Sequence, residues 1–257
     1  MGLTMKFIEK QRIQQHFQKA LNRYDANALV QKKINQQLIA QLIPNLPATP
    51  LDHVLELGCG TGLLSEQLQQ QIQAKHWILN DLCDVKNCLH KRLSQPFEFY
   101  CGDAEQFPFT RKYDLIITAS AVQWFHHKAE FIQHCKVGLK PDGLLAIATF
   151  GQENLKEIRT LTQIGLDYPD LSDWKEWLQT NFDLLYGETT TEELTFPTPI
   201  SVLQHLKNTG VTATGKGHWT KQQLNTFIKQ YQQQFSLLSK KVRLTYQPLW
   251  LIARYKQ

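Results

Sequence analysis

Residues 54–62 read VLELGCGTG, an apolar run that ends in three glycines spaced two residues apart. The apolar run is typical of a buried β-strand, and the glycines predict a turn directly after it. Glycine adopts positive φ and lets another molecule approach the backbone closely. The stretch therefore predicts a strand-to-helix turn that can wrap a ligand.

The spacing of the glycines separates two groups of cofactors. A dinucleotide fingerprint, G-x-G-x-x-G, needs a glycine at position 63, where this chain has Leu63. The motif here is G-x-G-x-G, with Glu56 two residues before its first glycine. The pattern therefore argues against NAD or FAD.

Predicted strands and helices alternate on both sides of the glycine turn. Two amphipathic helices precede the first strand, with apolar residues at helical spacing from Ile13 to Tyr24 and from Val30 to Leu42. The predicted strands are 53–57, 76–80, 97–101, 113–119 and 144–149, and the helices between them are 62–73, 84–93 and 127–138. Such alternation predicts a parallel, doubly wound α/β sheet.

Beyond Phe150 the pattern becomes mostly helical. Helices are expected near 153–164, 172–180, 199–208 and 219–238, with a possible strand at 182–186. The end of the chain, 242–254, alternates like a strand. Because Pro248 cannot donate a ladder hydrogen bond, that strand is predicted to begin at or just after it.

Carboxylates follow the second and third predicted strands. Asp81 comes nineteen residues after Gly62, and Asp103 follows the strand 97–101. Carboxyl ends of parallel strands share one edge, where Asp81 can accept both hydroxyls of a ribose. The alternative for either residue is a helix N-cap.

Cysteine usage and hydropathy point to a reducing compartment. The five cysteines, Cys59, Cys83, Cys88, Cys101 and Cys135, form no C-x-x-C pair, so we expect small buried residues and no metal site. The first residues lack the apolar core of a signal peptide, and no apolar run approaches membrane-spanning length. We expect a cytoplasmic protein that does not contact the membrane.

Charge is distributed unevenly over the 257 residues. Residues 151–200 carry three Lys and Arg against ten Asp and Glu, whereas residues 201–257 carry nine Lys and Arg and no Asp or Glu. The acidic and basic segments could face each other or be solvated. The alternative is a docking surface for an acidic partner, either a protein or a nucleic acid.

Together these motifs resemble the class I S-adenosylmethionine-dependent methyltransferases. The resemblance runs through ELGCGTG at 56–62, Asp81, GDA at 102–104, YDLI at 113–116 and LKPDG at 139–143. It implies that the glycine turn packs on the methionine part of S-adenosyl-L-methionine, that Asp81 holds the ribose and that Asp103 lies by the adenine amine. The cofactor-binding residues it implies are Glu56, Gly58, Gly60, Gly62, Asp81, Leu82, Asp103, Ala104 and Ser120.

Three further segments are similar to the malonyl-acyl-carrier-protein methyltransferases of biotin synthesis. They are QHFQKALNRYD at 15–25 with ALVQ at 28–31, SAVQWF at 120–125, and the end of the chain, with Leu203, Leu206, Lys207 and Gly210 followed by LTY at 244–246. Asn80 and residues 150–155 depart from the commoner pattern. The similarity implies methyl transfer to the free carboxylate of a malonyl thioester, which starts pimelate formation.

The similarity also implies an architecture and a substrate site. We expect a seven-stranded sheet with two N-terminal helices, a methyltransferase domain of residues 1–195 plus 241–257, and a helical lid insertion, 196–240, before the last strand. The expected substrate residues are Tyr24, Gln123, Trp124 and His218, with Lys216 nearby. Packing within the protein is the alternative for Tyr24 and Trp124. Acyl-carrier protein would dock on the basic 201–257 segment of a monomer.

Three alternatives share the cofactor motifs. One is a class I methyltransferase for another small molecule, such as a quinone precursor, and another is a binding regulator without enzyme activity. A nucleic-acid methyltransferase that acts on base amines usually has an Asn/Asp-Pro-Pro-aromatic motif after the fourth strand. This chain has SAVQ at 120–123 there, so no nucleic-acid substrate is expected.

Overall fold

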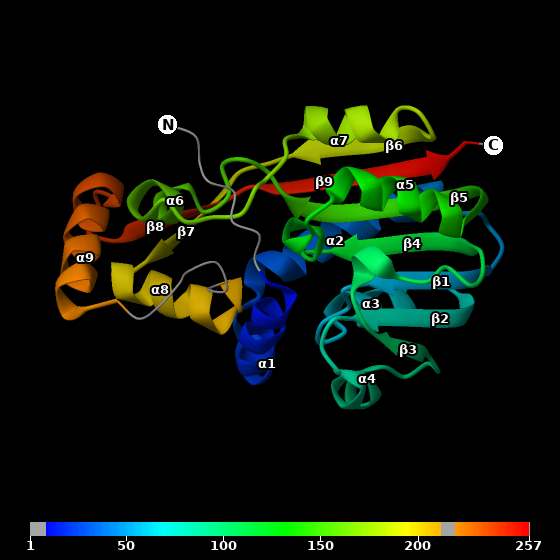
Figure 1. The fold of residues 1–257 in the computed structure, drawn as a ribbon, viewed down its shortest axis with the longest axis horizontal. Helices are drawn as coiled ribbons and strands as arrows, with labels where there is room; N and C mark the ends of the chain where they lie inside the picture. Colours follow the sequence, from blue (N-terminus) through cyan, green and yellow to red (C-terminus); the bar gives the residue numbers. More distant parts are fainter. Residues whose placement is uncertain (1–8, 212–218, 257) are drawn as a thin grey trace. The chain divides into compact units, whose positions relative to one another are not determined.

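The strand that leads into the glycine turn lies inside a seven-stranded sheet (Figure 1). The structure, a computed structural model, describes residues 9–211 and 219–256. In spatial order the strands are β3 (Glu98–Cys101), β2 (Ala74–Asp81), β1 (Leu51–Leu57), β4 (Tyr113–Ala119), β5 (Leu139–Phe150), β9 (Pro248–Tyr255) and β6 (Phe182–Thr189). The pairs among β1 to β5 are parallel, and β6 runs antiparallel to β9. The predicted doubly wound, mostly parallel seven-stranded sheet is confirmed.

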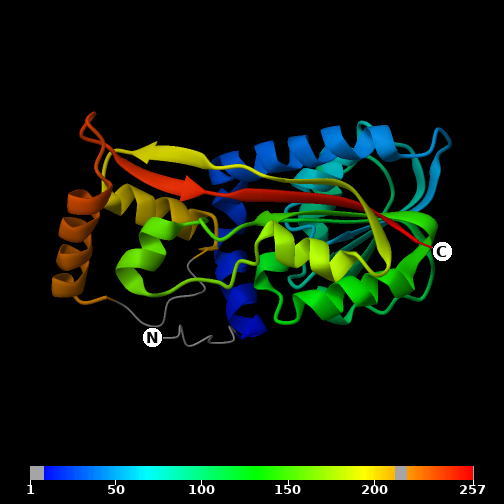
Figure 2. The same ribbon diagram turned by 90° about the horizontal axis from the view of Figure 1, so that it is seen from above.

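Burial on both faces explains why the central strands are continuous apolar runs. In β1, Val54, Leu55 and Leu57 are fully buried, as expected for a parallel strand covered by helices. Figure 2 shows α2 (Leu29–Leu42) on one face of the sheet and α5 (Lys128–Gly138) and α7 (Leu171–Leu178) on the other. The remaining helices beside this sheet are α3 (Leu63–Gln69) and α4 (Lys86–Arg92).

The chain forms two compact units. The larger consists of Leu29–Thr149, Pro169–Thr189 and Leu249–Gln257 and holds the sheet and the helices just named. The smaller consists of Met1–Ala28, Phe150–Tyr168 and Thr190–Pro248. The predicted lid insertion, 196–240, falls within the smaller unit, which also takes in the first helix. A lid function for it stays a prediction.

The smaller unit is built from helices around a two-stranded sheet. Its helices are α1 (Lys10–Asn27), α6 (Lys156–Thr162), α8 (Pro199–Asn208) and α9 (Lys221–Phe235). Its strands, β7 (Glu192–Phe196) and β8 (Val242–Tyr246), pair antiparallel. The sequence predicts one terminal strand starting near Pro248, and β9 begins there. The alternation before Pro248 belongs to β8, a separate strand with a different partner.

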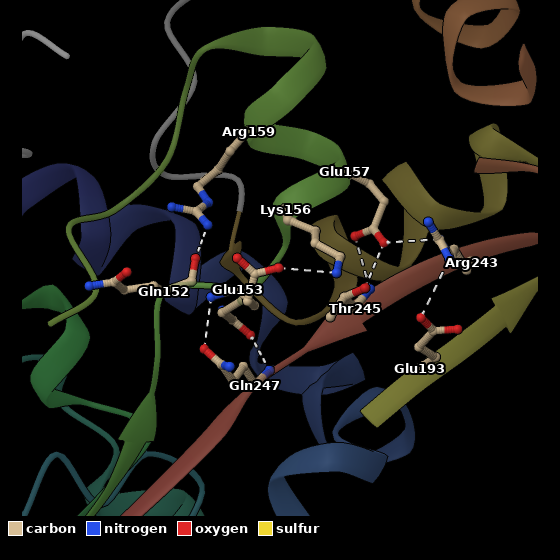
Figure 3. Close-up of polar contacts among 10 residues, drawn as sticks. Gln152, Glu153, Lys156, Glu157, Arg159, Glu193, Arg243, Thr245 and Gln247 are labelled. Carbon is tan, nitrogen blue, oxygen red and sulfur yellow. Dashed lines mark hydrogen bonds and ion pairs between the residues drawn. The ribbon is translucent and has the colours of Figure 1, made fainter. Parts of the chain in front are cut away.

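A buried carboxylate joins α6 to β8 in this unit (Figure 3). Glu157 has no exposed surface and accepts hydrogen bonds from the backbone N–H and the hydroxyl of Thr245, at 2.9 and 2.6 Å. Arg243 lies 3.8 Å from Glu157 and 3.6 Å from Glu193 on β7. The network fixes the two-stranded sheet to the helix that follows β5.

Candidate cofactor site

The sheet order places several polar groups at one edge. The order reverses between β1 and β4, because β2 and β3 lie on one side of β1 while β4 and β5 lie on the other. In open α/β sheets, ligands bind at the carboxyl ends of the strands where the order reverses. The glycine turn and the segments after β2 and β4 all meet at this edge.

The glycine turn depends on backbone conformations that other residues rarely adopt. Gly58, Gly60 and Gly62 all have positive φ, at 73°, 54° and 82°. A Cβ on Gly58 would lie 2.4 Å from the Cβ of Ala121, which follows β4. The N–H groups of residues 58 and 59 are held by the Asn80 carbonyl, both at 2.9 Å. The turn is therefore fixed in a shape that lets a ligand approach the backbone.

Two backbone hydrogen bonds fix the Asp81 carboxylate at the end of β2. Its carboxylate oxygens accept from the N–H groups of Gly60 and Cys83, each at 2.8 Å. Only 7% of the residue is exposed, and this burial raises the pKa of the Asp81 carboxyl while the two N–H groups oppose the rise. The Cys83 thiol also hydrogen-bonds this carboxylate. An ionised carboxylate has about four acceptor positions, so it can still accept a ligand hydroxyl.

The segment after β3 gives Asp103 a structural role. Asp103 is the N-cap of a 3-10 turn, Ala104–Gln106, and accepts a hydrogen bond from the Glu105 N–H at 3.1 Å. The N-cap alternative is thus confirmed, and a contact with adenine stays a prediction. Asn80 donates to the Tyr100 and Gly102 carbonyls at 3.1 and 2.9 Å. These two hydrogen bonds explain how a polar side chain is accommodated at the buried end of β2.

The turn after β4 brings Ser120 and Gln123 together. Ser120 has a left-handed backbone, with φ at 55°, and its carbonyl accepts from the Gln123 amide nitrogen at 2.6 Å. Gln123 is 8% exposed, whereas Trp124, which closes the 3-10 turn Val122–Trp124, is half-buried. Because Ala121 lies against Gly58, these residues flank the glycine turn.

Glu56 contacts the helix after the glycine turn. It is 2% exposed and accepts a hydrogen bond from the Ser65 hydroxyl of α3 at 2.6 Å. Burial raises the pKa of the Glu56 carboxyl to about 8, with the Ser65 hydrogen bond opposing the rise. The pair joins β1 to α3 across the turn, and a direct cofactor contact stays a prediction. Sequence reasoning missed Ser65, whose signal is a polar residue on the apolar face of α3.

The other predicted residues are only partly described. Tyr24 lies in α1 of the smaller unit, where its ring packs edge-on against Phe17 at 5.4 Å, so the packing alternative holds for this contact. Its place in a substrate site stays a prediction. Leu82 follows Asp81 and is half-buried. His218 and Lys216 lie outside the described residues.

The described part of the chain contains neither a cluster of metal ligands nor a membrane-spanning helix. Between 9 and 256, apart from 212–218, no group of three or more His, Cys, Asp or Glu could hold a metal ion. Nor does any helix in that part of the chain have the length and hydropathy to cross a membrane. Cys59, Cys83 and Cys135 are buried as predicted, whereas that prediction is wrong for Cys101, which is exposed.

Comparisons with known proteins agree with this geometry. The methyltransferase domain family matches residues 54–143. A malonyl-[acyl-carrier protein] O-methyltransferase from Haemophilus influenzae is 57% identical over 252 residues, covering 98% of this chain and 97% of that protein. One of the same name from Porphyromonas gingivalis is 40% identical over 255 residues, covering 98% and 99%.

Solved structures share the fold at low sequence identity. A putative methyltransferase from Bacillus halodurans has a TM-score of 0.64 at 17% identity and covers 86% of this chain and 100% of that one. The N-methyltransferase NodS from Bradyrhizobium japonicum, in complex with S-adenosyl-L-homocysteine, has a TM-score of 0.58 at 14% identity, covering 96% and 100%.

The sheet order, the glycine turn and Asp81 define, with the methyltransferase domain match and the named relatives, a class I methyltransferase that uses S-adenosylmethionine as its methyl donor. The residues at the sheet edge fit this cofactor, because the turn is open to close approach and Asp81 can accept hydroxyls. The sequence identity to the two named relatives extends over nearly the full length of the chain and therefore identifies a particular family within this class. The chain belongs to the malonyl-[acyl-carrier protein] O-methyltransferase family.

Proposed function

We propose that the protein transfers a methyl group from S-adenosylmethionine to the free carboxylate of a malonyl thioester on acyl-carrier protein. The observation that carries the proposal is the 57% identity, over 98% of the chain, to a relative named for this reaction. The relatives do not favour a quinone precursor or another free small molecule as the acceptor. A cytoplasmic location and a monomeric state stay predictions.

For this reaction the protein mainly has to align the methyl donor with the acceptor carboxylate. S-adenosylmethionine supplies a methyl group on a sulfonium. As the bond from the carboxylate oxygen to the methyl carbon forms, the methyl–sulfur bond breaks, so the two groups must be held in line. A malonyl carboxyl group is ionised at neutral pH, so no general base is needed. Opposite charges disappear in the transition state, which favours a site that excludes water.

Roles follow for the residues at the edge of the larger unit. The glycines would receive the methionine part of the cofactor, Asp81 the ribose hydroxyls, and Asp103 with Ala104 the adenine. Trp124 is half-buried and offers an indole N–H, a neutral donor that can orient a carboxylate without cancelling its charge. Tyr24 and His218 would supply further walls of the acceptor site.

The basic end of the chain would dock the carrier protein. Among the cations of this segment that the structure describes, two pair with carboxylates of the acidic segment, Arg243 with Glu193 and Lys256 with Asp183. Lys207, Lys240 and Lys241 are exposed, and none of them forms an ion pair with another described residue. They leave positive charge available for an acidic carrier.

The proposal is tested by incubating the protein with S-adenosylmethionine and malonyl-acyl-carrier protein and examining the carrier by mass spectrometry. We expect a mass gain of one methyl group, which mild base removes as expected for an ester. A carrier that bears an acetyl group, and so has no free carboxylate, is the control and should stay unmodified. Methyl transfer to a free small molecule, with no gain on the malonyl carrier, would overturn the proposal.

A further inference from the structure

The turn after β4 holds buried oxygen atoms that lack partners within the protein. Ser120 Oγ and Gln123 Oε1 are both buried, and neither forms a hydrogen bond with the residues that the structure describes. Thr118 Oγ1, two residues earlier, is in the same state. Buried polar atoms are almost always hydrogen-bonded. Several such atoms together indicate that a bound molecule supplies the missing partner.

The chemistry of that partner follows from the orientation of the Gln123 amide. Its nitrogen donates to the Ser120 carbonyl at 2.6 Å, and a carbonyl oxygen can only accept. The amide therefore cannot be reversed, and Oε1 is the end left without a partner. Oε1 needs a donor and would repel a carboxylate. This orientation argues against Gln123 as a ligand of the malonyl carboxylate.

Backbone strain and close packing place these atoms beside the glycine turn. Ser120 adopts a left-handed conformation, φ 55°, which is unfavourable for a residue with a Cβ. That conformation follows β4 directly and precedes Ala121, which would clash at 2.4 Å with any Cβ on Gly58. A group bound on the glycine turn therefore lies next to the segment that carries the oxygens.

We propose that Gln123 Oε1 and Ser120 Oγ accept hydrogen bonds from the α-ammonium group in the methionine part of the cofactor. The proposal rests on the proposed placement of that part on the glycine turn. A primary ammonium carries three N–H donors and no acceptor, which matches neighbouring oxygens that lack donors. Gln123 thus binds the cofactor, and the acceptor carboxylate is left to other groups.

The test compares two ligands by isothermal titration calorimetry. One is S-adenosylhomocysteine, and the other is its deaminated analogue, which keeps the carboxylate but has hydrogen in place of the ammonium. In Gln123→Ala we expect affinity for S-adenosylhomocysteine to fall about tenfold or more, as for loss of a hydrogen bond to a charged group. Affinity for the analogue should change less than about twofold. Gln71→Ala, at an exposed glutamine after α3, should change neither.

A second variant distinguishes the loss of a hydrogen bond from a general disturbance of the turn. Ser120→Gly removes the hydroxyl and suits the left-handed backbone, so it should also weaken S-adenosylhomocysteine alone. Equal losses for both ligands in both variants would overturn the proposal. So would unchanged affinity for S-adenosylhomocysteine with a raised KM for the malonyl carrier, because Gln123 would then contact the acceptor. Ligand discrimination without methyl transfer to that carrier would support this proposal and contradict the proposed function.

Discussion

At the scale of single residues, Glu56 is a buried acid two residues before the glycine turn. The side chain is 2% exposed and has one hydrogen-bond donor, the Ser65 hydroxyl. Desolvation disfavours the ionised form, which raises the pKa of Glu56 to about 8 from an ordinary value of 4.5. Around neutral pH the folded protein therefore keeps a proton that the unfolded chain releases.

This difference predicts a pH-dependent stability that Glu56 causes. Because the folded-state pKa is raised, the stabilising contribution is complete below pH 4.5 and is lost as the pH rises through about 8. Glu56→Gln cannot ionise, so its unfolding free energy should fall less steeply over this window, by up to about 1.4 kcal/mol per pH unit. Urea unfolding without cofactor, at pH 5 to 9, measures it. Glu176→Gln, at an exposed glutamate, should match the original protein, and equal slopes for both variants would contradict the prediction.

At the scale of elements, a close contact between two turns shapes the edge of the sheet where the strand order reverses. The turn after β1 can meet the turn after β4 only because Gly58 has no side chain, since a Cβ would approach Ala121 to 2.4 Å. Both turns also contain left-handed backbone, at the glycines and at Ser120. The two turns consequently behave as one structural feature.

Gly58→Ala should disturb both turns. We expect a loss of about 1–3 kcal/mol in unfolding free energy, from the positive φ and the clash, together with weaker binding of S-adenosylhomocysteine. Adding Ala121→Gly should recover part of the loss, because it removes the clashing methyl group but not the strain. Gly187→Ala serves as control, since its nearest neighbour would be a leucine methyl group at 3.3 Å. A Gly58→Ala protein as stable as the control would refute the steric argument.

The smaller unit offers a second prediction at this scale, at the joint between α6 and β8. Thr245→Val removes the hydroxyl that donates to buried Glu157 at 2.6 Å and leaves the carboxylate with an unsatisfied oxygen. The expected cost is about 1–3 kcal/mol, measured by chemical denaturation. Thr195→Val, at an exposed position of β7, should cost much less. A similar small effect at both positions would show that the joint is not important for stability.

At the scale of the whole molecule, the uneven charge makes the end of the chain a candidate docking surface. Residues 201–257 contain no carboxylate side chain. Of the cations that the structure describes there, Arg243 and Lys256 pair with acids of residues 151–200. Facing charges therefore account for part of the asymmetry. The exposed lysines outside those pairs are what an acidic carrier protein would meet.

Charge reversal tests this surface. Replacing Lys207, Lys240 and Lys241 with glutamate should raise the KM for malonyl-acyl-carrier protein about tenfold at low salt, because attraction becomes repulsion. The difference should shrink as ionic strength rises, and affinity for S-adenosylhomocysteine should stay the same. Glutamates at Lys33, Lys91 and Lys175, which are exposed outside the basic segment, are the control. Equal KM values for the two triple variants would exclude the surface.

Sequence periodicity predicted the elements well where packing is local or burial is complete. The strand 113–119 and the helix 199–208 have the predicted ends, because apolar periodicity and turn residues mark both. The strand pairing at the end of the chain could not be predicted in this way. Alternation over 242–254 predicts strand structure, but not that β8 pairs with β7 while β9 pairs with β6. Such pairing depends on residues about fifty to seventy positions away.

The sequence by itself determined the parallel sheet, the glycine turn and the acid after β2, because these depend on residue type, spacing and order along the chain. Only the tertiary structure decided what each polar group contacts. It assigned Asp103 to a cap, Glu56 to Ser65, and the Gln123 amide to a carbonyl. Hydrogen bonds are short and directional, and their partners come from different elements. Spacing places a residue at the edge of the sheet, whereas packing determines the direction of its side chain.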